Sequence, residues 1–186
     1  MTTPGTTENF EMVLTRTFDA PVSEVWRAWT EGDYIREWWG PSGFTAPVAE
    51  MDVREGGASL VALRAPDEMG GFEHFNTWSY QKIVPEERLE FTSRFADKDR
   101  NAIDPASVGI PPGVPKEVPH VLTFSSRPDG GTDFTVTEYG YTSPDMVELS
   151  RAGMDQCLDK MASLLAQTAQ PTDIRTRAPA RPGPFS

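Results

Sequence analysis

The chain has 186 residues, of which 38% are hydrophobic and 24% charged, enough for one domain with a real core. Its net charge of −11 and pI near 4.6 argue against binding to nucleic acid or to an anionic membrane surface. The single cysteine, Cys157, excludes an internal disulfide and a cysteine metal cluster, and we interpret it as a small buried hydrophobe.

No segment reaches the ~20 apolar residues of a membrane span. The N-terminal residues lack the basic start and the apolar run of a signal peptide. We therefore expect a cytoplasmic, monomeric protein without a membrane or nucleic-acid partner. No cofactor or metal is expected, because two histidines without a carboxylate motif make a poor metal site.

The first part of the chain predicts a strand and two short helices. Residues 1–8 are polar and predict a flexible N-terminus. Residues 10–18 alternate between apolar and polar side chains, as a half-buried strand does. Ala20-Pro21 then opens a helix whose apolar face comprises Val22, Val25, Trp26 and Trp29. A second helix over 34–39 ends at the stop signal Gly40-Pro41.

Six further strands are predicted between turn sequences rich in glycine, proline and acidic residues. They span residues 44–53, 58–64, 72–84, 89–95, 118–126 and 132–141. Residues 96–117 form a long irregular loop. Ser143-Pro144 marks the start of a long helix, whose apolar stripe comprises Val147, Met154, Leu158, Met161 and Leu165.

This order of elements predicts an α+β helix-grip (START-like) fold. Strands joined by short turns form a curved antiparallel sheet, and the long C-terminal helix must bury its stripe against the concave face. Two short helices and a central ligand cavity complete the domain, which we place at residues 9–168. The tail over 169–186 is rich in proline and arginine and is predicted to be disordered.

Strand parity selects candidates for the lining of that cavity. His120, Leu122 and Phe124 share one face of their strand, and Glu138 shares a face with Phe134 and Val136 on the next. The parities of the middle-strand aromatics do not all agree, so some of them point outward. The candidate ligand-binding residues are Trp38, Phe75, Trp78, Phe91, Phe95, Pro112, Val114, His120, Leu122, Phe124, Glu138, Met154 and Leu158. A plain core is the alternative interpretation.

Three polar residues are candidates for chemistry inside the cavity. His74 and His120 can act as acid or base, and a surface or capping role is the alternative for each. Glu138 would be a buried carboxylate if it faces the cavity. Buried carboxylates are costly unless they are paired, which makes Glu138 a functional candidate, with Arg94 or Lys82 as its partner.

Several motifs resemble the START-like (SRPBCC) superfamily, in particular its branch named for the activator of the heat-shock-protein ATPase. They are FDAPVSEVWRAWT at 18–30, WWGP at 38–41, DVREGG at 52–57 and IVPEERL at 83–89. The resemblance covers residues 10–166 and implies the helix-grip fold. It says little about activity, because the superfamily includes ligand binders, polyketide cyclases and proteins of unknown role.

Within this resemblance, Gly113 in the proline-rich segment IPPGVPKEVPH (residues 110–120) is similar to the loop glycine of calicheamicin self-sacrifice resistance proteins. The resemblance implies enediyne antibiotic resistance, in which the reduced drug abstracts a hydrogen from Gly113 and the chain is cleaved there. Such a protein is a stoichiometric reagent rather than an enzyme. A bare glycine Cα permits close approach, and prolines limit the freedom of the loop.

Other interpretations of the same residues stay open. Pro-Pro-Gly is a common turn sequence, in which the glycine only supplies a turn conformation. A polyketide aromatase or cyclase would use His120 and Glu138. A non-catalytic binder of hydrophobic small molecules, or a chaperone-associated module, would need neither.

Overall fold

Seven strands form one antiparallel sheet in the order β1-β7-β6-β5-β4-β3-β2 in the computed structural model, which describes residues 8–169. Apart from Glu8 and Ala169, the predicted flexible N-terminus and disordered tail lie outside the described residues. The strands are β1 (Phe10–Phe18), β2 (Thr45–Glu50), β3 (Ala58–Arg64), β4 (Glu73–Val84), β5 (Arg88–Ala96), β6 (Glu117–Ser126) and β7 (Thr132–Tyr141).

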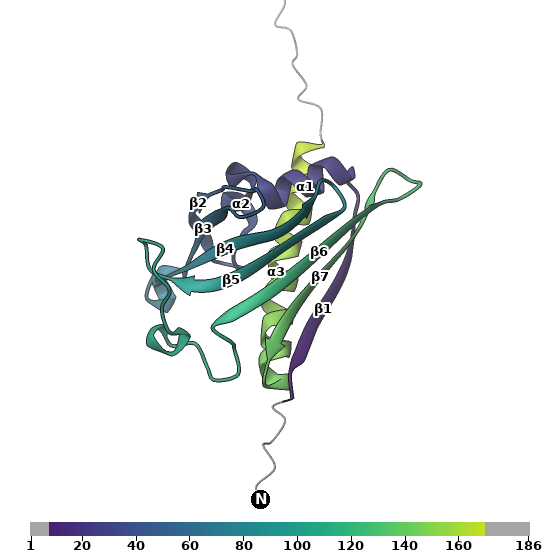
Figure 1. The fold of residues 1–186 in the computed structure, drawn as a ribbon. Coiled ribbons are helices and arrows are strands. Elements are labelled where there is room, and N and C mark those ends of the chain that lie inside the picture. Colours follow the sequence, from purple (N-terminus) through teal and green to yellow (C-terminus); the bar gives the residue numbers. More distant parts are fainter. Residues whose placement is uncertain (1–7, 170–186) are drawn as a thin grey trace, which may run out of the picture.

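Three α-helices accompany the sheet: α1 (Val22–Thr30), α2 (Gly32–Trp38) and the long α3 (Pro144–Thr168). Figure 1 shows α3 running across one face of the sheet, with α1 and α2 gathered at one end. The helix-grip prediction is thereby confirmed. Within residues 8–169, none of the helices combines the length and the apolar character that crossing a membrane requires.

Two boundaries differ from the prediction for identifiable reasons. Helix α2 begins at Gly32, two residues before the predicted start at residue 34. A Cβ at this position would lie 2.6 Å from the Ala49 carbonyl oxygen, so the glycine serves close packing of α2 on β2. Strand β2 ends at Glu50 and not at Val53. The Asp52 N–H donates to the Ser59 hydroxyl (3.0 Å), so the backbone ladder stops there.

The predicted irregular loop over 96–117 contains a short 3₁₀ helix, η2 (Pro105–Val108), and a similar turn, η1 (Asp67–Met69), precedes β4. The carboxylate of Asp104 accepts a hydrogen bond from the Ala106 N–H (3.0 Å) and caps η2. The sequence contains the signal for this helix: an aspartate at the N-cap, Asp104, is followed by a proline in the first turn, Pro105.

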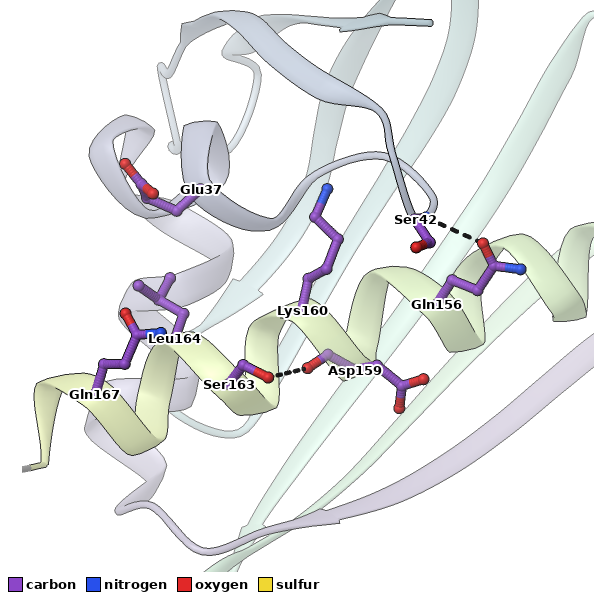
Figure 2. Close-up of a pocket in the computed structure, with 8 residues that line it drawn as sticks. All are labelled: Glu37, Ser42, Gln156, Asp159, Lys160, Ser163, Leu164 and Gln167. Atoms are coloured by element: carbon purple, nitrogen blue, oxygen red, sulfur yellow. Dashed lines mark hydrogen bonds between the residues drawn. The ribbon is translucent and has the colours of Figure 1, made fainter. Parts of the chain in front are cut away.

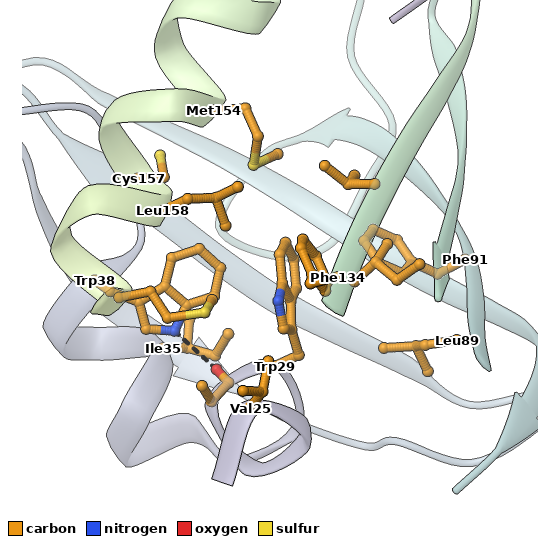
Figure 3. Close-up of a cluster of buried hydrophobic side chains, with 14 of the residues drawn as sticks. Val25, Trp29, Ile35, Trp38, Leu89, Phe91, Phe134, Met154, Cys157 and Leu158 are labelled. Atoms are coloured by element: carbon orange, nitrogen blue, oxygen red, sulfur yellow. Dashed lines mark hydrogen bonds between the residues drawn. The ribbon is translucent and has the colours of Figure 1, made fainter. Parts of the chain in front are cut away.

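Aromatic rings fill much of the space between the sheet and α3 (Figure 3). The ring of Trp29 packs against Trp38 at a centroid distance of 4.6 Å and stacks on Phe134 at 5.6 Å. Trp78 and Phe91 are stacked at 4.7 Å. All five of these side chains are at most 1% exposed, so their burial supplies much of the hydrophobic stabilisation.

Both edge strands accept hydrogen bonds from arginine side chains of the helices. Arg36 of α2 donates to the Ala49 carbonyl oxygen on β2 (3.3 Å). Arg151 of α3 donates to the Val13 carbonyl oxygen on β1. Each edge of the sheet is therefore bonded to a neighbouring helix.

Candidate functional site

The concave face of the sheet is tightly closed at one end and less closed at the other. Trp78 and Tyr80 on β4 and Phe91 on β5 lie on this face and are 1%, 3% and 1% exposed. By strand parity, the same face continues along both strands with residues that are only half-buried. These residues, which we call the open end, are His74, Asn76, Ser93 and Phe95.

The loop of residues 97–116 borders the open end. The Ile103 N–H donates to the Phe95 carbonyl oxygen (3.0 Å), and the His74 ring lies near the backbone of Val108. Burial nevertheless lowers the pKa of His74 below its ordinary value, since its contact with Val108 only partly offsets desolvation. The side chain of Val114 packs against the core. The loop is thus fixed to the rim of the concave face.

Gly113 lies between this loop and the start of α3. Its φ of +104° is unfavourable for any residue with a Cβ. A Cβ here would also lie 2.9 Å from Cγ of Met146 and 2.9 Å from Cβ of Ser143. The Gly113 carbonyl oxygen accepts a hydrogen bond from the Thr142 N–H (3.1 Å). The local fold therefore requires glycine at this position, whatever else the residue does.

A buried ion pair lies on the concave face beside α3. The register of the sheet places His120 of β6 directly opposite Glu138 of β7, and Nε2 of His120 is 3.2 Å from Oε1 of Glu138. Nδ1 of His120 is 2.8 Å from the Val118 carbonyl oxygen. Both ring nitrogens therefore face an oxygen acceptor. The ring also stacks on Phe91 at 4.6 Å.

Two hydroxyl groups complete the environment of Glu138. Tyr141 and Ser150 donate to its Oε2 at 2.5 and 2.6 Å. Burial would raise the pKa of Glu138, but the His120 charge and these hydrogen bonds outweigh it and hold that pKa below its ordinary value. Burial, followed by the Glu138 charge, raises the pKa of Tyr141. The carboxylate is therefore ionised and fully paired.

This pairing corrects two expectations. The sequence suggested Arg94 or Lys82 as the partner of Glu138, but Arg94 pairs with Glu117 and the partner of Glu138 is His120. The alternative of a surface role for His120 is also wrong, because the side chain is 7% exposed. Tyr141 and Ser150 were missed. Ser150 lies between Val147 and Met154 at helical spacing along the apolar stripe of α3, which is a signal the sequence does contain.

Two tryptophans of the interior carry buried N–H groups without a partner among the described residues. They are Nε1 of Trp29 and Nε1 of Trp39. Trp38 differs, since its Nε1 donates to the Ala28 carbonyl oxygen at 2.8 Å (Figure 3). Trp39 is half-buried and packs edge-on against Trp78 at 4.9 Å. The sequence alone could not separate these three indoles, because their difference lies in what each N–H meets.

The other predicted ligand-binding residues divide by position. Phe95 lies at the open end, and Val114 lies on the loop that borders it. Phe75 has the opposite strand parity to Trp78 and lies on the convex face, which corrects its assignment to the cavity. Pro112 is exposed on the loop. The remainder belong to the buried interior: Trp38, Trp78, Phe91, Leu122, Phe124, Met154 and Leu158.

A surface groove of ≈ 350 Å³ lies elsewhere, along the exposed side of α3 (Figure 2). It is lined by Glu37, Ser42, Gln156, Asp159, Lys160, Ser163, Leu164 and Gln167. The Lys160 ammonium donates to the carbonyl oxygens of Gly40 and Phe44, at 3.0 Å each, and burial lowers its pKa. The lining is mostly polar and the Lys160 ammonium is already bonded to two backbone carbonyl oxygens, so the groove does not suit a hydrophobic ligand.

Metal and thiol chemistry find little support in the described part of the chain. No group of three or more His, Cys, Asp or Glu side chains within residues 8–169 is arranged to hold a metal ion. Cys157 is buried, and burial raises the pKa of its thiol to about 11, so the thiolate is scarce at neutral pH.

The fold and the sequence both have relatives. A family model described as "Activator of Hsp90 ATPase homolog 1-like protein" matches residues 19–166. Protein CV1439 from Chromobacterium violaceum is 27% identical, with a TM-score of 0.67 over 83% of this chain and 96% of its own. Protein Ms6760 from Mycobacterium smegmatis (23%, TM-score 0.66) covers 87% of this chain and 91% of its own. The AHSA1 protein of Silicibacter pomeroyi (17%, TM-score 0.67) covers 86% and 99%. No curated protein matches the chain.

Proposed function

The chain belongs to the Activator of Hsp90 ATPase homolog 1-like family, and from this premise we propose that it binds a hydrophobic small molecule between the concave face of the sheet and α3. The family sits in the START-like superfamily, whose fold binds such molecules. The observation that carries the proposal is the burial gradient along β4 and β5. Side chains of one face pass from nearly complete burial at Trp78 and Phe91 to half-burial at Asn76 and Ser93.

The chemistry of the open end fits this ligand class. Phe95 supplies an apolar wall opposite Asn76, and the aromatic interior begins at Trp78, two residues further along β4. Ligand sites are typically apolar with a few placed polar groups, and His74, Asn76 and Ser93 are the polar groups at this entrance. An apolar ligand that enters here exchanges water for contact with the aromatic interior.

Titration with the environment-sensitive dye Nile red tests the proposal. Replacing Ser93 by Trp fills the entrance and should reduce dye affinity by at least about tenfold, while Thr92→Trp on the opposite face of the same strand should leave it unchanged. Equal affinities for the two variants, or no saturable binding to the parent protein, would refute the proposal.

Acid–base catalysis on a polyketide is less well supported by the geometry. A general base needs an unprotonated nitrogen within reach of the substrate. Both nitrogens of His120 already face protein acceptors, and both oxygens of Glu138 are engaged. The pair is arranged to hold charge in place.

One observation favours enediyne quenching as a second candidate. A hollow of ≈ 230 Å³ lies beside Gly113, lined by Asp104, Pro105, Ala106, Ile110, Pro111, Pro112, Val114 and Lys116. A drug diradical held there would take a hydrogen atom from the Gly113 Cα and form a C–H bond on its own ring. Dioxygen would then add to the Cα radical, and the chain would break at that residue.

Intact mass spectrometry after mixing the protein with calicheamicin and a thiol tests this second candidate. Two fragments that divide at Gly113 would support it. An intact chain under conditions that consume the drug would reject it, and Gly113 would keep only its structural role in the turn.

A further inference from the structure

The interior contains hydrogen-bond donors that the protein itself does not use. The indole N–H groups of Trp29 and Trp39 are both buried and unpartnered within the described residues. A buried polar group without a partner loses its hydration and gains nothing in exchange, so such groups are rare in folded proteins. Two in one aromatic cluster, with ring centroids 6.5 Å apart, form an unusual concentration.

These donors are neighbours of the proposed ligand site. Trp29 is fully buried, but Trp39 is only half-buried and its ring lies edge-on against Trp78. Two residues before Trp78 on the same face of β4 is Asn76, which belongs to the open end. The unpartnered N–H groups are therefore connected to the open end through one strand face and one ring contact.

An indole N–H donates and cannot accept, so its partner must carry a lone pair. Among the described residues, no protein acceptor forms a hydrogen bond with either indole nitrogen. We propose that Trp29 and Trp39 recognise a carbonyl-type oxygen on a flat, apolar ligand. This inference rests on the proposed function and adds the polar group that the ligand must have.

Such a site favours a ligand with a carbonyl oxygen over one without it, because only the former gives the indole N–H groups an acceptor. A ligand with a carbonyl oxygen gives the donors their missing partner, whereas an isostere without that oxygen leaves them desolvated and unpaired. Sites built in this way discriminate against the analogue that lacks the polar group. A single carbonyl has two lone pairs, so one oxygen has the capacity for both N–H groups.

The test compares 9-fluorenone with fluorene, two flat probes that differ only in whether a carbonyl or a methylene closes the central ring. We expect fluorenone to bind about tenfold more tightly, the value of one good hydrogen bond. In ¹H–¹⁵N spectra, the indole signals of Trp29 and Trp39 should move on binding of fluorenone. The signal of Trp38 is an internal control that should stay in place, because its N–H is already bound to Ala28.

Trp39→Phe is the variant of choice, because Trp39 is half-buried and its N–H has no protein partner to lose. It should reduce the preference for fluorenone, because only the Trp29 donor remains, and retain the binding of fluorene. Trp26→Phe is the matched control, since Trp26 is also half-buried but packs on Phe124, away from Trp39, and should retain the preference.

Equal affinities for the two probes, or indole signals that do not move, would overturn the inference and leave the binding proposal intact. The two N–H groups would then be assigned to buried water or to the faces of neighbouring rings. If neither fluorene nor fluorenone binds, and Nile red does not bind either, both proposals fail together.

Discussion

His120 and Glu138 form an ion pair straight across two neighbouring strands, with 3.2 Å between Nε2 and Oε1 and with both side chains below one tenth exposed. Burying such a pair has a large desolvation cost, and here hydrogen bonds from Tyr141 and Ser150 to Glu138 help to offset it. The pair links β6 and β7 to α3 through Ser150. Replacing one residue of the pair and replacing both should therefore change the free energy of unfolding by different amounts.

Glu138→Leu alone removes one partner of the buried pair and leaves His120, Tyr141 and Ser150 without their acceptor, and we expect it to lower the free energy of unfolding by about 3 kcal/mol or more. The double variant His120→Phe/Glu138→Leu removes both charges, and phenylalanine can keep the stack on Phe91. It should be more stable than Glu138→Leu. Urea unfolding monitored by tryptophan fluorescence decides this, and additive losses would show that the two groups are not coupled.

The lowered pKa of Glu138 predicts a specific acid sensitivity. Because its pKa in the folded protein lies below the ordinary 4.5, the carboxylate stabilises the fold fully above that value. The contribution is lost as the pH falls through the lower folded-state pKa. The stability difference between the parent protein and Glu138→Gln should therefore shrink between about pH 6 and about pH 3. A difference that stays constant over this range would contradict the assignment of an ionised Glu138.

Gly113→Ala should be more costly than Gly109→Ala, although both residues have positive φ. A Cβ at Gly109 meets nothing within 4 Å, so only backbone strain of about 1 kcal/mol applies. At Gly113 the same strain is joined by clashes with Met146 and Ser143, for a total of about 2–3 kcal/mol. Thermal unfolding of both variants measures the difference, and equal losses would mean that the loop moves away from α3 freely.

Replacing Trp38 and replacing Trp39 should destabilise the protein to different extents, because only the Trp38 N–H has a protein acceptor. Trp38→Phe leaves the Ala28 carbonyl, near the end of α1, without its donor, and should cost about 1–3 kcal/mol beyond the loss of packing. Trp39→Phe removes an N–H that has no protein partner and should cost clearly less. Urea midpoints of the two variants test this order, and the reverse order would place the important donor on Trp39.

The architecture was predictable from sequence because it depends on periodicity. Alternation over residues 10–18, the helical stripe from Val147 to Leu165 and the turn sequences between strands each depend on neighbours along the chain. The same local signals gave all seven strands and the long helix in the right order. Errors arose where one residue meets a distant one, as at Gly32 against Ala49 and at Asp52 against Ser59.

The candidate site was less predictable for the same physical reason. Strand parity placed His120 and Glu138 each on the apolar face of its own strand. The choice of partner depended on the register between the strands, and Arg94 or Lys82 was expected instead. Phe75 and Trp78 differ by an odd number of residues on one strand, so their opposite faces were already implied. Nothing in the sequence distinguishes the bonded indole of Trp38 from the unbonded ones of Trp29 and Trp39.

The arginine contacts at the two sheet edges bear on how this protein behaves at high concentration. An unpaired edge strand is a template for another chain, and cells must avoid that kind of self-association. Here, Arg36 occupies a carbonyl of β2 and Arg151 one of β1, and each places a positive charge where an incoming strand would dock. These two side chains thus disfavour edge-to-edge association of the sheets of two molecules, an effect unrelated to any ligand.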